Sequence, residues 1–358
     1  MSLRLLMTAD TVGGVWIYAL SLCAALSKAS ITVKLVALGS PSEQQCDAAN
    51  RLENVELHVR PVRLEWMQDA WPDLDELEGE LLELGRDCDL VHLNHLVHGH
   101  LNWGRPVICA VHSCVLSWFE AVRGHSAPAE WDVYRRRVGR SLRAADHVIA
   151  PSQWMLQRAG NLYGPLHRRS VIANGSAAPP GDPEAPREGI LAAGRVWDDA
   201  KNLAPLAEMG PRLSAALSIV GPRRTPGGLQ PKHRAEAGDL PQQILCARMR
   251  RTRIFAAPAL YEPFGLGVLE AARSGCALVL GDIATLREIW QGAAVFVDPR
   301  RPADLEWALE HLLHHRRERV RLAQTAHQRA AGYTLERMGQ CYVALYRRCV
   351  TTAMAQAS

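Results

Sequence analysis

The sequence is poor in lysine, in phenylalanine and in long apolar segments. Only four of its 41 basic residues are lysines, and only four of its 358 residues are Phe. No apolar run reaches the roughly 18 residues that span a bilayer, which excludes an ordinary membrane-spanning helix. The N-terminal apolar run meets Asp10 too early to form the apolar core of a signal peptide. These absences predict a cytoplasmic protein.

Metal-binding or disulfide-forming cysteine patterns are also lacking. The nine cysteines are scattered, and no two of them form a C-x-x-C. Such spacing indicates buried thiols in a reducing compartment. The net charge is only +4, and 48% of the residues are hydrophobic. This composition excludes an intrinsically disordered chain and argues against a dedicated nucleic-acid binder. It carries no signal for an oligomeric state.

What the sequence does contain is an alternation of short apolar runs and helical stretches. In the first half the predicted buried strands are 3–8, 31–38, 90–93, 107–111, 147–150 and 170–173, and the predicted helices are 13–28, 72–88 and 128–145. Continuous apolar strands that alternate with helices are typical of a parallel sheet covered on both faces.

The alternation restarts after a segment rich in Pro and small residues at 176–186, which is typical of a linker. The strands predicted there are 190–193, 217–220, 254–257, 277–280 and 295–297, and the helices are 202–209, 266–274 and 303–330. We therefore predict an α/β protein of two Rossmann-like, doubly wound domains, at 1–178 and 188–333, facing each other across a deep cleft. A last helix within 334–358 is expected to cross back onto the first domain.

Two turns carry residues suited to phosphate. Gly13-Gly14 follows the first strand, where glycines let backbone amides approach a phosphate, although a plain tight turn explains them equally well. The dinucleotide fingerprint G-x-G-x-x-G is absent, which weakens a dehydrogenase interpretation. In the second half, Gly194-Arg195 ends a strand and Lys201 precedes a helix. Two cations at this position are suited to binding a diphosphate; the alternative is that both are solvated surface charges.

The most informative segment follows the strand at 254–257. Glu262 precedes a loop shaped by Pro263 and Gly265, and Glu270 lies in the helix that begins near Leu266. Amides of Phe264, Gly265 and Leu266 would face an anion or a sugar hydroxyl. Acids at this position suit hydroxyl recognition, and they also suit the first turn of any helix.

The Glu262-x7-Glu270 spacing within Glu-Pro-Phe-Gly-Leu resembles the signature of the retaining glycosyltransferases of family 4, which have the GT-B fold. The resemblance extends over about residues 3–330, through the segments 13–14, 145–152, 171–175, 194–195 and 201–202. It implies that Arg195 and Lys201 bind the donor diphosphate and stabilise its leaving charge. It further implies that Glu262 and the 264–266 amides hold the transferred sugar, that Glu270 holds the ribose, and that Gly13 and Gly14 approach the phosphate.

The resemblance also assigns residues of the first domain. His112, after the strand at 107–111, matches a family histidine that contacts the donor sugar near the reacting carbon; taken alone it would be an ordinary partly buried histidine. His95, His98, Trp118 and Arg123 are candidates for acceptor binding. We expect no metal and no cofactor. The histidines within 92–100 are interpreted as acceptor contacts or loop residues. The D-x-D pattern at Asp87-Cys88-Asp89 is interpreted as a chance occurrence of a metal-binding motif.

The implied reaction is metal-independent transfer of a hexosyl-type sugar, with retention, from a nucleotide-diphosphate sugar. A UDP-sugar is favoured, a GDP-sugar is the alternative, and the acceptor is a hydroxyl of a glycan, a lipid-linked molecule or a small molecule. Two other functions stay open: a GT-B nucleotide-sugar epimerase, and a catalytically silent nucleotide-sugar-binding protein. Basic clusters at 135–137, 248–253 and 316–321 suggest peripheral contact with the inner face of a membrane, or are solvated helix faces.

Overall fold

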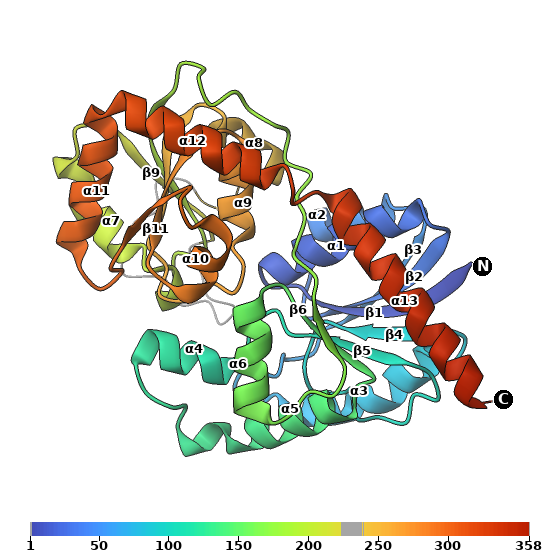
Figure 1. The fold of residues 1–358 in the computed structure, drawn as a ribbon. Coiled ribbons are helices and arrows are strands. Elements are labelled where there is room, and N and C mark those ends of the chain that lie inside the picture. Colours follow the sequence, from blue (N-terminus) through green and yellow to red (C-terminus); the bar gives the residue numbers. More distant parts are fainter. Residues whose placement is uncertain (1, 223–237, 239, 358) are drawn as a thin grey trace. The chain divides into compact units, whose positions relative to one another are not determined.

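The structure is a computed structural model that describes residues 2–222, 238 and 240–357, and it contains two compact units. Unit 1 comprises Met1–Glu120, His125–Gly175 and Leu335–Ser358. Unit 2 comprises Ala121–Gly124 and Ser176–Thr334. Each unit is built on its own parallel sheet, which confirms the predicted pair of Rossmann-like α/β domains (Figure 1).

The sheet of unit 1 has the strand order β3-β2-β1-β4-β5-β6-β7. Its strands are β1 (Leu3–Asp10), β2 (Ile31–Leu38), β3 (Val55–Arg60), β4 (Leu90–Leu93), β5 (Val107–Ala110), β6 (His147–Ala150) and β7 (Arg169–Val171). The chain leaves β1 toward β2 and later returns to β4 on the other side of β1. In such open sheets, ligands bind at the carboxyl ends of the strands beside this reversal.

Except for the last one, the helices of unit 1 lie between successive strands. They are α1 (Gly14–Ser27), α2 (Glu43–Asn50), α3 (Trp71–Leu84), α4 (Val115–Trp118), a π-helical turn at Phe119–Arg123 whose last residues are grouped with unit 2, a 3-10 turn at Ala129–Trp131, α5 (Asp132–Ala144), α6 (Gln153–Tyr163) and α13 (Leu335–Ala357). Sequence periodicity did not predict α2, β3 or α6. Local caps mark both helices, since Ser42 and Gln45 form a capping box on α2 and Ser152 accepts from the Met155 amide on α6.

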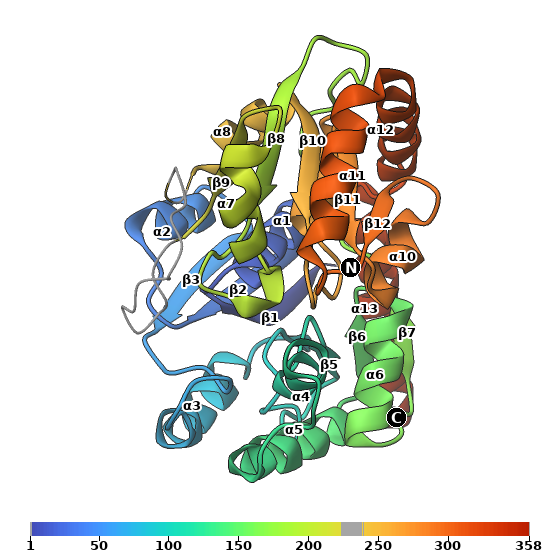
Figure 2. The ribbon, with the colours of Figure 1, turned by 90° about the vertical axis from the view of Figure 1, so that its left-hand side faces the viewer.

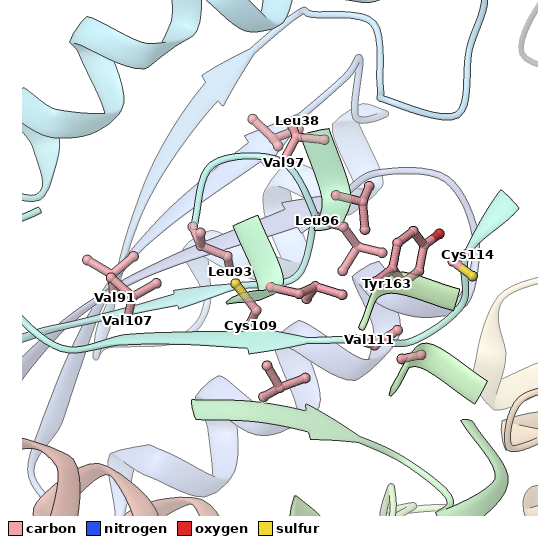
Figure 3. Packing of buried hydrophobic residues seen from close by; sticks show 14 of the residues in the cluster. Leu38, Val91, Leu93, Leu96, Val97, Val107, Cys109, Val111, Cys114 and Tyr163 are labelled. Atoms are coloured by element: carbon pink, nitrogen blue, oxygen red, sulfur yellow. The ribbon is translucent and has the colours of Figure 1, made fainter. Parts of the chain in front are cut away.

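The core of unit 1 is divided by its sheet. Val91 and Leu93 of β4 pack with Val107 and Cys109 of β5 into a buried apolar cluster that also contains side chains of α3, α5 and α6 (Figure 3). Because successive side chains of a strand point to opposite faces, His92 lies on the other side of the sheet. There its Nδ1 is 2.6 Å from the hydroxyl of Tyr346 in α13.

Helix α13 belongs to unit 1 and lies along α1 (Figure 1). The hydroxyl of Tyr18 in α1 donates to the hydroxyl of Tyr342 in α13 over 2.5 Å, and both side chains are fully buried. At Gly339 a Cβ atom would come within 2.7 Å of the Ala25 Cβ, so the lack of a side chain lets the two helices approach closely. The C-terminal helix is therefore part of the core of unit 1.

The sheet of unit 2 has the order β12-β11-β10-β8-β9, with helices on both of its faces (Figure 2). Its strands are β8 (Glu188–Ala193), β9 (Leu217–Val220), β10 (Thr252–Ala257), β11 (Ala277–Gly281) and β12 (Val295–Val297). Its helices are α7 (Ala204–Met209), α8 (Gln242–Met249), α9 (Leu266–Arg273), α10 (Ala284–Trp290), α11 (Pro302–His314) and α12 (Arg316–Ala330), with 3-10 turns at Asp199–Lys201 and Gly210–Arg212.

Two predicted helices differ in extent from those in the structure. The helix predicted at 72–88 stops at Leu84, after which the chain turns before β4. The helix predicted at 303–330 is divided into α11 and α12, because His315 has φ −104° and ψ 72°, outside the helical region. None of the helices within the described residues is long and apolar enough to cross a bilayer.

Candidate functional site

The glycine loop of unit 1 joins the carboxyl end of β1 to α1. Gly13 has φ +86° and is the N-cap of α1, a conformation that favours glycine, and Gly14 is the first residue of that helix. Both are exposed. Asp10, at the end of β1, accepts hydrogen bonds from the Val12 amide at 2.6 Å and from the Trp66 indole at 3.1 Å. Asp10 thus holds the loop that leads into the exposed glycines at the start of α1.

His112 stands just beyond the carboxyl end of β5, in the same unit. Its Nε2 is 2.8 Å from Oδ1 of Asn94, which follows β4. The centroid of its ring lies 4.3 Å from that of Tyr18, in an edge-on arrangement. Burial lowers the pKa of His112 to about 4, so the ring is neutral near pH 7. The side chain is half-buried.

The residues predicted to bind an acceptor occupy different environments. His95 and His98 are buried, and they bond to each other through Nε2 and Nδ1 at 2.5 Å. Trp118 is half-buried, with its ring edge-on to Phe119. Arg123 is exposed, lies in the short segment grouped with unit 2, and donates to Asp199 at 2.8 Å. Within unit 1, the buried His95 and His98 therefore form no exposed acceptor surface with Trp118.

The histidines at 92–100 do not converge on one point. His92 contacts Tyr346, and Nδ1 of His100 bonds to the Val97 carbonyl at 3.0 Å. Within the described ranges no group of three or more His, Cys, Asp or Glu residues is arranged to hold a metal ion. Asp87 of the D-x-D segment forms ion pairs with Arg4 and Lys34.

In unit 2, Arg195 follows the carboxyl end of β8 and is held by Asp198. One guanidinium nitrogen lies 2.5 Å from Oδ2 of Asp198, and the guanidinium lies 5.4 Å from the centre of the Trp197 ring. Asp198 is buried, and burial opposes its ionisation. The charges of Arg195 and Lys201 and the hydrogen bonds from Arg195 and the Ala200 amide nonetheless hold its pKa below the usual range. Asp198 is therefore an ionised anchor for Arg195.

Lys201 ends the 3-10 turn that follows Asp198 and reaches Glu262. Its Nζ is 2.6 Å from Oε2 of Glu262, and both side chains are about one-fifth exposed. Asn202 adopts a left-handed conformation (φ 52°), and its amide donates to the carbonyls of Pro258 and Pro299 at 2.9 and 2.6 Å. These bonds tie the Lys201 turn to the loop after β10, so Lys201 and Glu262 are held together.

The Glu262 loop leads into helix α9. The Glu262 carbonyl accepts from the Thr285 hydroxyl at 2.6 Å, and the Phe264 ring packs edge-on against Tyr333. Gly265 has φ +91° and is the N-cap of α9, which begins at Leu266. Glycine offers no side chain to the first amides of the helix, so they can bind an anion or a hydroxyl oxygen.

Glu270 lies in α9 and is only 6% exposed. Burial raises its pKa to about 7, although Oε1 accepts a hydrogen bond from the side chain of Gln242. A carboxylate buried in this way is costly for folding, which is typical of a group kept for function. A ligand that donates two hydroxyl groups would compensate for that cost.

Glu270→Gln is expected to stabilise the ligand-free protein above pH 7. Folding raises the pKa of Glu270 from 4.5 to about 7, so ionisation of this carboxyl opposes folding. The free energy of unfolding is therefore highest below pH 4.5 and falls as the pH rises to 7. Replacing the carboxylate by an amide recovers about 3 kcal/mol at pH 8, at roughly 1.4 kcal/mol per pKa unit. Urea unfolding of both proteins at pH 5 and pH 8 measures the difference.

Glu65→Gln is a matched control for this prediction. Glu65 is equally buried, burial raises its pKa to about 7, and its Oε1 accepts from the Leu96 amide at 3.0 Å in unit 1. Both variants should gain stability, whereas only Glu270→Gln should weaken nucleotide binding. Equal nucleotide affinity in wild type and Glu270→Gln would contradict a ligand role for Glu270.

Several residues that shape the unit 2 site were not predicted from the sequence. Asn202 and Thr285 act on residues that are close only after folding, whereas Asp198 lies three residues after the Arg195 that it holds. Gly221, after β9, has φ +146°, and a Cβ there would lie 1.9 Å from the Gly194 carbonyl oxygen. This close backbone contact requires glycine beside Gly194-Arg195. A glycine immediately after a predicted strand was the signal available in the sequence.

Comparison with known proteins agrees with this geometry. A model described as Glycosyltransferase Family 4 matches residues 12–176, and a model described as Glycosyl transferases group 1 matches residues 237–329. A search of curated proteins gave no match. The two family models thus match unit 1 and the part of unit 2 that carries Glu262 and Glu270.

Solved structures with a similar fold align over almost the whole chain. Sucrose-phosphate synthase from Thermosynechococcus elongatus has a TM-score of 0.79 at 16% identity, covering 99% of this chain and 100% of its own. Anabaena HepE in complex with UDP and glucose has a TM-score of 0.75 at 16% identity, covering 97% and 100%. An E. coli trehalose-6-phosphate structure bound with UDP-2-fluoro glucose has a TM-score of 0.67 at 13% identity, covering 96% and 98%. The two family models match different parts of the chain, and its two Rossmann-like units have the architecture of the GT-B fold, so the chain resembles the glycosyltransferases of family 4.

Proposed function

We propose that the chain transfers a hexosyl-type sugar from a UDP-sugar to an acceptor hydroxyl with retention of the anomeric configuration. The observation that carries the proposal is the pair of cations at the carboxyl ends of the unit 2 strands. Arg195 is held by Asp198 and Lys201 by Glu262, next to the open N-terminus of α9. Positive charge that is fixed before a ligand binds suits a diphosphate leaving group.

In the proposed reaction the bond between the anomeric carbon and the diphosphate oxygen breaks. The acceptor oxygen bonds to the same face of that carbon, and its proton passes to the departing diphosphate. Arg195 and Lys201 stabilise the negative charge that grows on the diphosphate, so positive charge comes from side chains and we propose that the reaction needs no metal ion. Glu262 and the 264–266 amides orient the sugar, and Glu270 accepts from the ribose hydroxyls.

The Lys201–Glu262 ion pair gives the unit 2 site two states. Without a ligand the Lys201 ammonium is neutralised by Glu262 at 2.6 Å. With a nucleotide sugar, we propose that the ammonium turns to the diphosphate while Glu262 accepts from a sugar hydroxyl. Lys201 then exchanges one charged partner for another, and Glu262 exchanges the ammonium for a hydroxyl donor, so neither is left without a partner.

The preference for UDP is supported by solved structures of similar fold. Anabaena HepE is described in complex with UDP and with UDP-glucose, and the E. coli structure is described with UDP-2-fluoro glucose. Acceptor binding is proposed for unit 1, where the Gly13-Gly14 loop follows the carboxyl end of β1 and His112 follows that of β5, on either side of β4. Because His95 and His98 are buried, an acceptor there would meet the loops around them.

UDP is expected to bind more tightly than GDP or ADP. At one hundred times its dissociation constant it should stabilise the folded protein by about 2.7 kcal/mol. Thermal-shift screening followed by titration calorimetry measures both effects. Tighter binding of GDP would redirect the donor assignment, and no binding of any nucleoside diphosphate would contradict the proposed function. Slow release of UDP from UDP-glucose without acceptor would distinguish a transferase from a silent binding protein.

A further inference from the structure

The side-chain amide of Asn94 has a single chemically consistent orientation. Its Nδ2 lies 2.8 Å from the backbone carbonyl of Thr8, and its Oδ1 lies 2.8 Å from Nε2 of His112. A carbonyl can only accept, so the NH2 group must face Thr8. The oxygen must then face His112, and because an amide oxygen also only accepts, Nε2 of His112 must carry a hydrogen.

The backbone of Asn94 is held by a directional chain of hydrogen bonds. This series of hydrogen bonds ends at the Leu74 carbonyl, which lies 3.0 Å from Nε2 of His98. Because a carbonyl only accepts, Nε2 of His98 is the donor and Nδ1 of the same neutral ring is an acceptor. Nε2 of His95, 2.5 Å away, therefore carries the hydrogen. Nδ1 of His95 then accepts from the Thr8 hydroxyl at 2.8 Å, and the same hydroxyl accepts from the Asn94 amide at 3.0 Å.

Neutral imidazoles are required throughout this chain. A protonated His98 would oppose two N–H groups across 2.5 Å, and a protonated His95 would turn its Nδ1 from an acceptor into a donor toward the Thr8 hydroxyl. Burial lowers the pKa of His98 to about 4 and that of His95 further below the usual range, so both rings remain neutral and the direction is preserved. His95 and His98 therefore act as supports for Asn94, which explains why such polar side chains are buried at the end of β4.

The ring of His112 is held from a second side. Tyr18 lies edge-on at 4.3 Å between ring centroids, and the Tyr18 hydroxyl is itself bonded to Tyr342 of α13. The Nε2 hydrogen bond and the Tyr18 contact together restrict rotation of the imidazole. Nδ1 of His112 makes no hydrogen bond to any residue that the structure describes.

We propose that Asn94 is a positioning residue that locks His112 as its Nε2–H tautomer and leaves Nδ1 as a hydrogen-bond acceptor for a hydroxyl of the sugar substrate. The sugar as ligand rests on the proposed function, whereas the tautomer follows from the hydrogen bonds alone. In this state Nδ1 has no proton to donate. His112 then recognises a hydroxyl group and does not protonate the leaving group.

The tautomer is tested directly by nitrogen NMR of protein labelled with 15N-histidine, using His112→Leu to assign the signals. Nδ1 of His112 should give a pyridine-type signal and Nε2 a pyrrole-type signal. In Asn94→Ala the two nitrogens should move toward averaged values, because both tautomers become populated. A pyridine-type Nε2 in the wild type would overturn the proposal, whether or not the protein binds nucleotide.

Asn54→Ala is the matched control for Asn94→Ala. The side-chain amide of Asn54 likewise donates to the backbone, here to the carbonyls of Cys23 and Ile31 at 2.9 and 3.1 Å, but it does not contact His112. Asn54→Ala should leave the tautomer and kcat unchanged, whereas Asn94→Ala should lower kcat threefold to tenfold, the ratio that corresponds to one neutral hydrogen bond. A loss of kcat in both variants without a tautomer change in either would mean a merely structural role.

A double-mutant cycle tests whether Asn94 acts through His112. In a His112→Leu background, Asn94→Ala should have no further effect on kcat, since the group it positions is gone. His112→Asn, whose oxygen can occupy the Nδ1 position, should retain more transfer than His112→Leu. Additive losses, or equal activity of the two His112 variants, would overturn the hydroxyl contact. Failure of the proposed function is recognised separately, by the absence of UDP binding.

Discussion

Lys201→Ala is expected to lower kcat for sugar transfer by about two to three orders of magnitude. This is the range found when one preorganised group that stabilises transition-state charge is removed. Lys201 is placed for that role because its stem lies against the backbone at Gly194, where a Cβ would be only 3.3 Å from its Cγ. Glycine at 194 thus lets the lysine stem lie against the end of β8. Steady-state kinetics with UDP-glucose and a competent acceptor measures the loss.

Lys34→Ala provides a matched control. Lys34 also forms an ion pair at 2.6 Å, with Asp87, and its side chain is 22% exposed against 20% for Lys201. It lies on β2 and takes no part in the proposed reaction. Transfer by Lys34→Ala should equal that of the wild type. A comparable loss in both variants would indicate general damage, and a loss confined to KM would assign Lys201 to binding alone.

Tyr342→Ala is expected to reduce the free energy of unfolding by about 3–5 kcal/mol, the range for removing a large buried aromatic side chain. Tyr342 is 1% exposed, stacks on His92 at 5.4 Å between centroids, and accepts from the Tyr18 hydroxyl. The variant leaves a cavity and removes the partner of a buried hydroxyl. Urea unfolding followed by circular dichroism measures the change in stability.

Two further variants separate packing from hydrogen bonding. Tyr342→Phe keeps the ring and should cost only about 1–2 kcal/mol, because just the Tyr18 hydroxyl loses its partner. Trp307→Ala removes an aromatic ring that is 64% exposed, and its effect should stay within about 0.5 kcal/mol. If Tyr342→Ala were as mild as Trp307→Ala, α13 would not contribute to the core of unit 1.

Helix α13 supports both the core of unit 1 and the candidate site. This helix holds Tyr18 through Tyr342, and Tyr18 in turn contacts His112. A helix that begins more than 220 residues after His112 in the sequence therefore supports a residue of the candidate site. The physical basis is ordinary packing, since two buried tyrosines and one histidine ring leave little room for alternative rotamers.

The candidate residues of unit 2 could be read from the sequence because they are local. Gly265 and Leu266 stand at a helix start, and Arg195 stands at a strand end, so each is marked by the change from one element to the next. The sequence did not indicate which side chains these residues contact. Asp198 next to Arg195 has no signature of its own, and Gln242 is 28 residues from Glu270.

The roles of the candidate residues of unit 1 were harder to predict from the sequence. His95 and His98 have the composition of a polar binding loop, yet they are buried because each nitrogen of both rings finds a partner inside the unit. Asn94 was not predicted as a candidate at all. Its importance comes from contacts to Thr8 and His112, which belong to the ends of different strands.

By itself, the sequence determined the alternation of apolar strands and helices, the two-domain architecture and the local motifs at helix starts. These depend on periodicity and on neighbours within a few residues. Only the tertiary structure decided which side chains meet: Lys201 with Glu262, Asn94 with His112, and Tyr342 with Tyr18. Such contacts depend on the order in which strands lie side by side in a sheet. That order places β4 next to β1, although β2, β3 and three helices separate them along the chain.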